Sequence, residues 1–193
     1  MSTEQNVPAA NKEKKDPMRD LFPDLPVMRS DRLCLRPLES RDAEDLLRLT
    51  RQDIVYRYLP TYLFEKQSGN MENVIRELYR ECLEDSLILG VFRNEQFCGL
   101  AEVYGYRAPI RKASVGYRLL EETWGRGIAT EALGLLVQEL LENRGIEIIT
   151  ASTMIENEAS ARVLRKNGFT LVSHAVGEDW GYPQPTPADK WIR

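Results

Sequence analysis

The feature that most constrains the fold is the segment from residue 112 to 153, which predicts a strand, a glycine turn, a helix and a second strand. KASVGYRLL predicts the first strand, and WGRGIAT then places two glycines where a long helix begins. Apolar residues recur along that helix from Ala129 to Leu141, and Arg144 and Gly145 predict its end. IEIITAST follows and is apolar on both faces. This order predicts two parallel strands joined by a crossover helix.

The glycine turn predicts an anion-binding site. A helix start exposes unpaired backbone N–H groups and about half a positive charge. Gly125 and Gly127 have no side chain to block a close approach, and Arg126 adds a charged donor. Thr130 adds a hydroxyl in the first turn, whereas the lysine of a Walker loop and the third glycine of a dinucleotide fingerprint are missing. A loop that needs glycine only for its dihedral angles is the alternative interpretation.

The rest of the chain predicts a mixed α/β domain built around one sheet. Antiparallel strands come early, and the strand-helix-strand unit comes late. Strands are predicted at 31–38, 86–92, 97–106, 169–176 and 188–193, and helices at 40–51, 71–85 and 158–168.

Composition divides the chain and excludes several classes of function. Residues 1–26 hold four of the ten prolines and no periodic apolar pattern, so they predict a mostly disordered leader before a single domain at 27–193. The net charge of −4 argues against nucleic-acid binding. No run reaches the about 18 apolar residues of a membrane span, and the start lacks the apolar core of a signal peptide. We therefore expect a cytoplasmic protein with no membrane partner.

The cysteines and the single histidine do not predict a metal site. Cys34, Cys82 and Cys98 have no CxxC spacing, and they do not cluster with His174. His174 lies in a predicted strand, where a structural or surface role is the more common one. We expect reduced thiols and no bound metal.

Three stretches in order resemble the GNAT acyltransferases, and among them the RimJ/RimL type that acetylates protein N-terminal amines. They are DRLCLRPLESRDAEDL, VGYRLLEETWGRGIATEA and NEASARVLRKNGF, and the resemblance covers residues 28–193. The superfamily signature is Arg or Gln, two residues, Gly, one residue, then Gly or Ala. Here Trp124 takes the first place, and Gly127 and Ala129 complete it. The resemblance implies the GNAT fold: a central, mostly antiparallel twisted sheet of about seven strands with flanking helices and a splayed parallel pair at the coenzyme site.

In such enzymes the anion is the pyrophosphate of acetyl-CoA. The strand end before the turn is implied to pair with the pantetheine arm through its backbone, and Asn157 to hydrogen-bond that arm. A plain helix cap is the alternative role for Asn157. The implied coenzyme-binding residues are Tyr117, Arg118, Leu119, Gly125, Arg126, Gly127, Ile128, Ala129, Thr130 and Asn157.

Acetyl transfer requires a neutral amine and a protonated leaving group, so we searched for a base and an acid. Ser160 is the candidate acid, because the RimJ/RimL type commonly carries serine there, while the superfamily's usual tyrosine position is Leu164. An ordinary helix serine is the alternative. Ser114 occupies the place where many relatives have a strand glutamate. The candidate bases are therefore Asp179, with Glu178 beside it, and Glu102; a surface carboxylate is the alternative for each.

We therefore expect an acetyl-CoA dependent N-acetyltransferase that acts by direct attack in a ternary complex. The expected acceptor is a protein N-terminal α-amine. The alternatives are a small-molecule amine acetyltransferase, of polyamine, aminoglycoside or amino-acid type, and a catalytically silent CoA-binding module. A homodimer is compatible with the sequence. Aromatic residues available to line an acceptor site are Tyr56, Tyr58, Tyr62, Tyr104, Tyr106 and Trp180.

Overall fold

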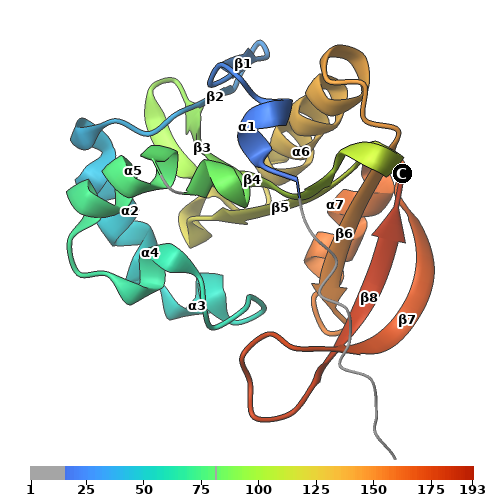
Figure 1. The fold of residues 1–193 in the computed structure, drawn as a ribbon. Helices are drawn as coiled ribbons and strands as arrows, with labels where there is room; N and C mark the ends of the chain where they lie inside the picture. The colour runs from blue at the N-terminus through green and yellow to red at the C-terminus, as the bar shows by residue number, and fades with distance from the viewer. Residues whose placement is uncertain (1–15, 81) are drawn as a thin grey trace, which may run out of the picture.

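A computed structural model describes residues 16–80 and 82–193, and these form one eight-stranded sheet with helices on both faces (Figure 1). The strand order is β1-β2-β3-β4-β5-β6-β8-β7, and every neighbouring pair is antiparallel except β5 and β6. The expected fold class is confirmed, and a two-residue strand, β1, adds one strand to the expected number. The strands are β1 Met28–Arg29, β2 Cys34–Arg36, β3 Ser86–Arg93, β4 Gln96–Arg107, β5 Lys112–Leu119, β6 Ile148–Met154, β7 Thr170–Glu178 and β8 Thr186–Ile192.

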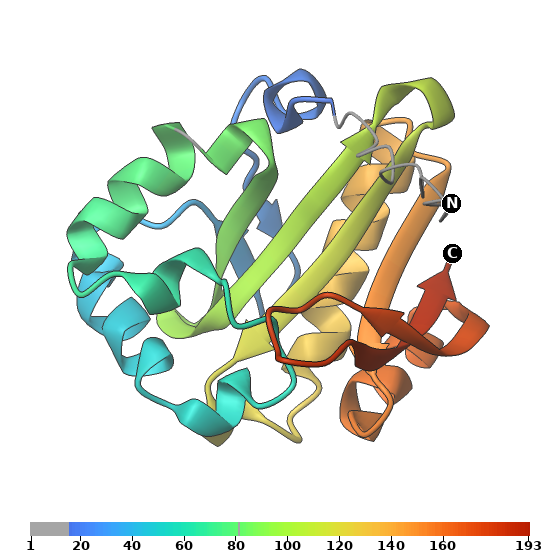
Figure 2. The same cartoon turned by 60° about the horizontal axis from the view of Figure 1, so that its bottom comes forward.

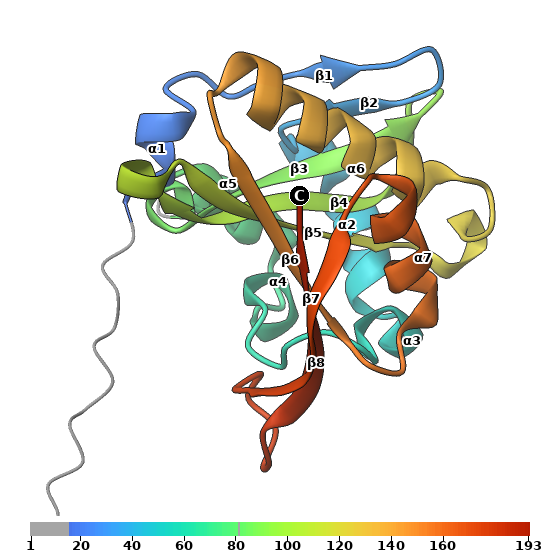
Figure 3. The same cartoon turned by 90° about the vertical axis from the view of Figure 1, so that its right-hand side faces the viewer.

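The helices cover the two faces of the sheet as two layers. Figure 3 shows α6 and α7 on one face and α2 and α4 on the other. Each layer encloses its own group of buried side chains, one with Leu133 and Leu136 of α6 and one with Leu46 and Leu49 of α2. The α-helices are α1 Met18–Leu21, α2 Ala43–Thr50, α3 Asp53–Tyr56, α4 Phe64–Gln67, α5 Met71–Arg80, α6 Ile128–Gln138 and α7 Glu158–Lys166.

The crossover helix ends near the predicted residue. The α-helical hydrogen-bond pattern of α6 gives way to a π-helical turn at Glu139–Asn143. Gly145 then has φ 65°, a left-handed conformation that glycine adopts without a steric cost. The predicted strand-helix-strand unit is therefore present as β5, α6 and β6.

The predicted leader differs from the structure in its last part. Residues 1–15 lie outside the described residues, but α1 forms within the segment that we expected to be disordered. Met18, Leu21 and Phe22 are 0%, 5% and 1% exposed and belong to the same core as α6. Their spacing of three and one forms a short apolar stripe, and burying it stabilises this segment against the sheet.

The parallel strands β5 and β6 pair only at their first residues. Their register runs from Lys112↔Ile148 to Ser114↔Thr150. Beyond that point β5 continues beside β4, while β6 continues beside β8 (Figure 2). Among the described residues, one backbone edge of β5 therefore has no strand partner along the end of the strand, which leads directly to the glycine turn.

Candidate functional site

The glycine turn between β5 and α6 has the conformation that its sequence predicts. Gly125 and Gly127 have φ values of 71° and 78°, and Gly127 is the N-cap of α6. No atom lies within 4 Å of the position that a Cβ would take on Gly125. Trp124 Nε1 donates to the carbonyl oxygen of Leu119 at 2.9 Å and so joins the turn to the end of β5. The N–H groups of the first helical turn are thus presented on an open backbone surface.

The acidic residue in the first turn of α6 is paired. Ser30 Oγ donates to Glu131 Oε1 at 2.5 Å, and Arg32 Nε donates to Glu131 Oε2 at 2.8 Å. Burial works to raise the pKa of Glu131, but these hydrogen bonds outweigh it and lower the pKa. Because Arg32 balances the carboxylate, the positive end of the helix dipole stays available to an anion.

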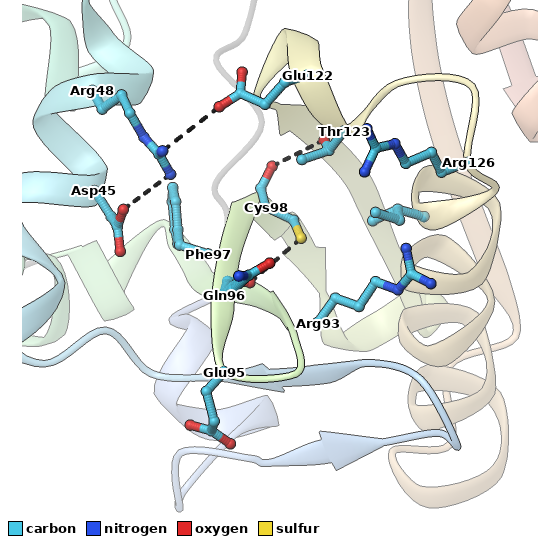
Figure 4. A pocket seen from close by; sticks show the side chains of 11 residues that line it. Asp45, Arg48, Arg93, Glu95, Gln96, Phe97, Cys98, Glu122, Thr123 and Arg126 are labelled. Carbon is cyan, nitrogen blue, oxygen red and sulfur yellow. Dashed lines mark hydrogen bonds and ion pairs between the residues drawn. The ribbon is translucent and has the colours of Figure 1, made fainter.

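A cavity of about 470 Å³ lies beside the turn, bordered by Arg126, Arg93 and α2 (Figure 4). Arg48 on its far side is paired with Asp45 at 3.0 Å. Arg93 and Arg126 have no ion pair with any residue in 16–80 or 82–193. Two unpaired guanidinium groups next to a helix start add to the attraction for a negatively charged ligand.

The side chains of β5 point alternately to the two faces of the sheet, and this divides the site into two sides. Ser114 Oγ lies 2.8 Å from Thr150 Oγ1, at the last point where β5 and β6 pair. Past this point, successive side chains of β5 point to opposite faces of the sheet. Tyr117 reaches α7 on one face, and Arg118 reaches α4 and β4 on the other.

Ser160, Asn157 and Tyr117 meet on the α7 side. Asn157 Oδ1 accepts a hydrogen bond from the backbone N–H of Ser160 at 3.1 Å, so its side chain caps α7. This hydrogen bond uses the amide oxygen and leaves the NH₂ group of Asn157 as a donor. Tyr117 Oη donates to Ser160 Oγ at 3.0 Å. The candidate acid is therefore held by groups from both β5 and α7.

A buried cluster of charges occupies the opposite side. Arg118 Nε lies 2.6 Å from Glu65 Oε1, and Arg118 Nη1 donates to Glu102 Oε2 at 3.0 Å. Tyr56 Oη donates to the same Glu65 oxygen at 3.1 Å. Burial works to lower the pKa of Arg118, but the two carboxylates outweigh it and raise the pKa. Arg118 is therefore charged, and it fixes Glu102 on β4 to Glu65 on α4.

Glu102 is the most enclosed of the three candidate bases. Its side chain is 16% exposed. Burial raises the pKa of Glu102, and the charge of Arg118 opposes this rise only in part. A carboxylate with a raised pKa binds a proton more readily at neutral pH, which suits a general base. Three buried atoms beside it, Arg118 Nε, Arg118 Nη2 and Glu65 Oε2, have no hydrogen-bond partner among the described residues, although Arg118 Nε lies at ion-pair distance from Glu65.

The other two candidate bases, Glu178 and Asp179, differ in the partners that their carboxylate oxygens have. Glu178 forms an ion pair with Lys190 and accepts a hydrogen bond from Trp180 Nε1 at 2.9 Å, so both of its oxygens have partners. Asp179 is exposed and accepts from the backbone N–H of Gly181 at 3.0 Å.

Tyr62 lies within electrostatic reach of both Asp179 and Glu102. Burial raises the pKa of the Tyr62 hydroxyl, and the charges of Asp179 and Glu102 add to that rise. The backbone supports this arrangement, because Thr61 N donates to the carbonyl oxygen of Trp180 at 2.9 Å. Two acidic residues from distant parts of the chain therefore act on one tyrosine.

Sequence reasoning named Tyr117 and Arg118 for their backbone only, so it missed the contacts of their side chains, and it missed Glu65 altogether. The alternation of β5 was a signal for Tyr117 and Arg118, because it places neighbouring residues on opposite faces. Glu65 gave no such signal, because its short segment shows no periodic pattern of apolar residues. In the structure Glu65 is only 1% exposed. His174 is paired with Asp189 at 2.6 Å on the outer strands, in line with the structural role that we expected.

Residues 16–80 and 82–193 contain no group of His, Cys, Asp and Glu that could hold a metal ion. Within the same residues, no helix is long and apolar enough to cross a membrane. Cys34 and Cys98 are free thiols.

Comparison with known proteins agrees with the geometry. Residues 32–170 match the family model of the acetyltransferase (GNAT) domain. The curated N-acetyltransferase YoaA from Bacillus subtilis is 29% identical over 168 residues, which cover 85% of this chain and 93% of YoaA.

Solved structures of the same fold include enzymes with different acceptors. RimL, an alpha-N-acetyltransferase of a ribosomal protein solved with coenzyme A, has a TM-score of 0.74 and 19% identity over 87% of this chain and 97% of its own. A spermidine N-acetyltransferase chimera from Vibrio cholerae has a TM-score of 0.68 and 17% identity over 84% of this chain and 95% of its own. At these identities the likeness concerns the fold.

Proposed function

The chain belongs to the GNAT acetyltransferase family and is an acyltransferase, and from this we propose that it transfers the acetyl group of acetyl-CoA to the α-amino group of a protein N-terminus. The observation that carries the proposal is the separation of β5 from β6 after Ser114↔Thr150, next to the glycine turn. An unpaired strand edge beside a helix N-terminus suits a long ligand with amide groups at one end and a diphosphate at the other.

The residues of the site fit acetyl-CoA. The diphosphate would receive hydrogen bonds from backbone N–H groups of residues 125–130, with Arg126 adding charge. The free edge of residues 117–119 would pair with the amides of the pantetheine arm. Asn157 would donate its remaining NH₂ group to the same arm. Tyr117 and Ser160 would then be available to the acyl sulfur, and Glu102 to the incoming amine.

The proposed reaction is a direct attack of the amine on the thioester. The amine attacks in its neutral form, which an α-amine with a pKa of about 8 supplies near neutral pH, and Glu102 accepts the proton that the nitrogen loses as the C–N bond forms. The new C–N bond forms, and a backbone N–H near Leu119 stabilises the oxyanion. The C–S bond then breaks, and its electron pair goes to sulfur, which receives a hydrogen bond from Ser160. Asp179 is the second candidate base, and Glu178 is disfavoured because Lys190 and Trp180 already bind it.

A small-molecule amine is the second candidate acceptor. The observation that favours it is the pair of carboxylates, Asp179 and Glu102, that act on Tyr62. Two carboxylates that both act on one tyrosine suit an acceptor with more than one ammonium group, as in a polyamine. The fold also accommodates spermidine acetylation in the Vibrio cholerae protein.

The test is acetylation of a panel of amines. We would incubate the protein with acetyl-CoA and peptides with free N-termini, spermidine, an aminoglycoside or free amino acids, and measure thiol release and the mass of each product. We expect one added acetyl group on peptides with a free N-terminus, and none on the same peptides with a blocked one. Turnover on spermidine alone would favour the second candidate. Coenzyme binding without turnover on any amine would identify a silent CoA-binding module.

A further inference from the structure

The hydroxyl groups of Tyr117 and Ser160 form a pair that spans the gap between β5 and α7 (Tyr117 Oη to Ser160 Oγ, 3.0 Å). We propose that Tyr117 is a positioning residue that orients the Ser160 hydroxyl toward the coenzyme sulfur, so that the leaving thiolate is stabilised by two linked hydroxyl groups. The inference rests on the proposed function and adds Tyr117 to it.

The position of the pair supports this role. Tyr117 lies on β5 past Ser114, which is the last residue of that strand to pair with β6. Ser160 lies in the first turn of α7, and its backbone N–H is fixed by the Asn157 cap. One hydroxyl therefore comes from β5, which is one of the diverging strands. The other comes from α7, the helix that follows β6, the second diverging strand. A ligand held along the free edge of β5 has to pass them.

The direction of the hydrogen bond determines what Ser160 can do. Tyr117 donates and Ser160 Oγ accepts, so the serine keeps its own O–H for another acceptor. A serine near a helix start otherwise tends to bond to nearby backbone groups. The hydrogen bond that Tyr117 donates limits this alternative. It also polarises the Ser160 hydroxyl, because linked hydrogen bonds strengthen one another.

Tyr117 keeps its proton throughout the reaction. Burial raises the pKa of Tyr117 to about 12, and the hydrogen bond with Ser160 works in the opposite direction. A thiol has a pKa of about 8.5, so a tyrosine does not give up its proton to a thiolate. The C–S bond breaks, sulfur takes the electron pair, and Ser160 donates a hydrogen bond to it. The thiolate then gains, through water, the proton that the amine released, which balances the reaction.

The experiment measures the thiol pKa of bound coenzyme A. Tyr117→Phe, Ser160→Ala, the double variant and wild type would be saturated with coenzyme A, and the rate of alkylation of the bound thiol would be followed against pH. Tyr182→Phe is the matched control, because the Tyr182 hydroxyl also donates a hydrogen bond, but to the carbonyl oxygen of Leu59 at 3.0 Å rather than to Ser160. Affinity for coenzyme A and thermal unfolding would show that each variant is folded.

We expect the thiol pKa of the bound coenzyme to rise by about one unit in Ser160→Ala and by about half a unit in Tyr117→Phe, since a hydrogen bond to a charged group is worth roughly that much. The double variant should match Ser160→Ala, because Tyr117 acts through the serine. The value of kcat should fall roughly threefold in Tyr117→Phe, while KM for acetyl-CoA stays unchanged. The Tyr182→Phe control should leave kcat, KM and the thiol pKa unchanged.

Three outcomes would overturn the inference. One is an unchanged thiol pKa in folded Tyr117→Phe, and another is additive effects in the double variant. If Tyr117→Phe does not fold, 3-fluorotyrosine at position 117 keeps the hydroxyl and is a stronger donor. It should lower the thiol pKa, and a rise would contradict us. If the wild-type protein acetylates its acceptor normally, any of these results leaves the proposed function intact. If the wild-type protein does not bind coenzyme A, both the inference and the proposed function are overturned.

Discussion

At the scale of single residues, the surroundings of each carboxylate decide what it can do. Glu102 and Glu178 are both acidic residues on strands. Glu178 is neutralised by Lys190 and bonded to Trp180, whereas Glu102 has one oxygen bound to Arg118 in a buried cluster. Arg118 itself lies between Glu102 and the buried Glu65, so the cluster as a whole keeps one negative charge.

The first prediction concerns Glu102→Gln and pH. A base must be deprotonated, and burial raises the pKa of Glu102, so wild-type kcat should rise with pH through a pKa above that of an ordinary glutamate. Glutamine cannot accept the proton, so kcat should fall by roughly 10²- to 10⁴-fold and this rising limb should disappear. Initial rates of thiol release measured across pH would check both.

Asp179→Asn is the matched control, since it removes the other candidate base near Tyr62. We expect a loss of kcat below about tenfold with the rising limb retained. The reverse pattern, with the limb lost only in Asp179→Asn, would assign the base to Asp179 instead.

At the scale of elements, the turn and helix that bind the proposed diphosphate are local features. Gly127 is the N-cap of α6 with a left-handed backbone, and the chain needs no distant partner to form this turn. The charge balance around it does depend on distant contacts. Arg32 comes from the loop between β1 and β2 and neutralises Glu131 in the first turn of α6.

The second prediction concerns Arg126→Glu in the glycine turn. The substitution replaces an attraction with a repulsion next to the diphosphate, so affinity for coenzyme A should fall roughly tenfold at low salt. Isothermal titration would measure it. Because Arg126 is exposed, the difference should shrink as ionic strength rises.

Arg41→Glu provides the control for Arg126→Glu. Arg41 is also exposed but precedes α2, on the other layer of helices. Its reversal should leave coenzyme affinity unchanged. Equal affinities for wild type and Arg126→Glu at low salt would contradict the assignment of the diphosphate to this turn.

At the scale of the whole molecule, the N-terminal segment closes the core. Phe22 is 1% exposed, and the guanidinium carbon of Arg144 lies 4.8 Å from the centroid of its ring. Asp16 N donates to the carbonyl oxygen of Tyr106 at 3.1 Å, so this segment also joins the end of β4. Residues before β1 thus contact the end of the crossover helix and the sheet together.

The third prediction is that Phe22→Ala lowers the free energy of unfolding by about 3 to 5 kcal/mol, the usual cost of removing a buried aromatic ring. Urea unfolding followed by fluorescence would measure it. Leu25→Ala is the control from the same segment, because Leu25 is 38% exposed and should cost within about 0.5 kcal/mol. Equal losses in both variants would show that α1 does not stabilise the core.

The sequence by itself determined most of the strands, the longer helices and the glycine turn. Strand and helix periods, caps and glycine dihedrals depend on residues that are close in the chain, which is why β5, α6 and β6 were predictable. The family resemblance added the splayed pair of strands and the roles of the candidate site residues. The expected leader failed at α1, because three apolar residues form too short a pattern to predict a helix.

Only the tertiary structure decided which side chains share the site. Tyr117 and Ser160 are 43 residues apart in the chain, and Arg118 and Glu102 are 16 apart. Glu65 reaches Arg118 from a short helix whose sequence gives no sign of burial. Such contacts form only when the sheet brings β4, β5 and α7 together, and burial then sets the pKa of each group.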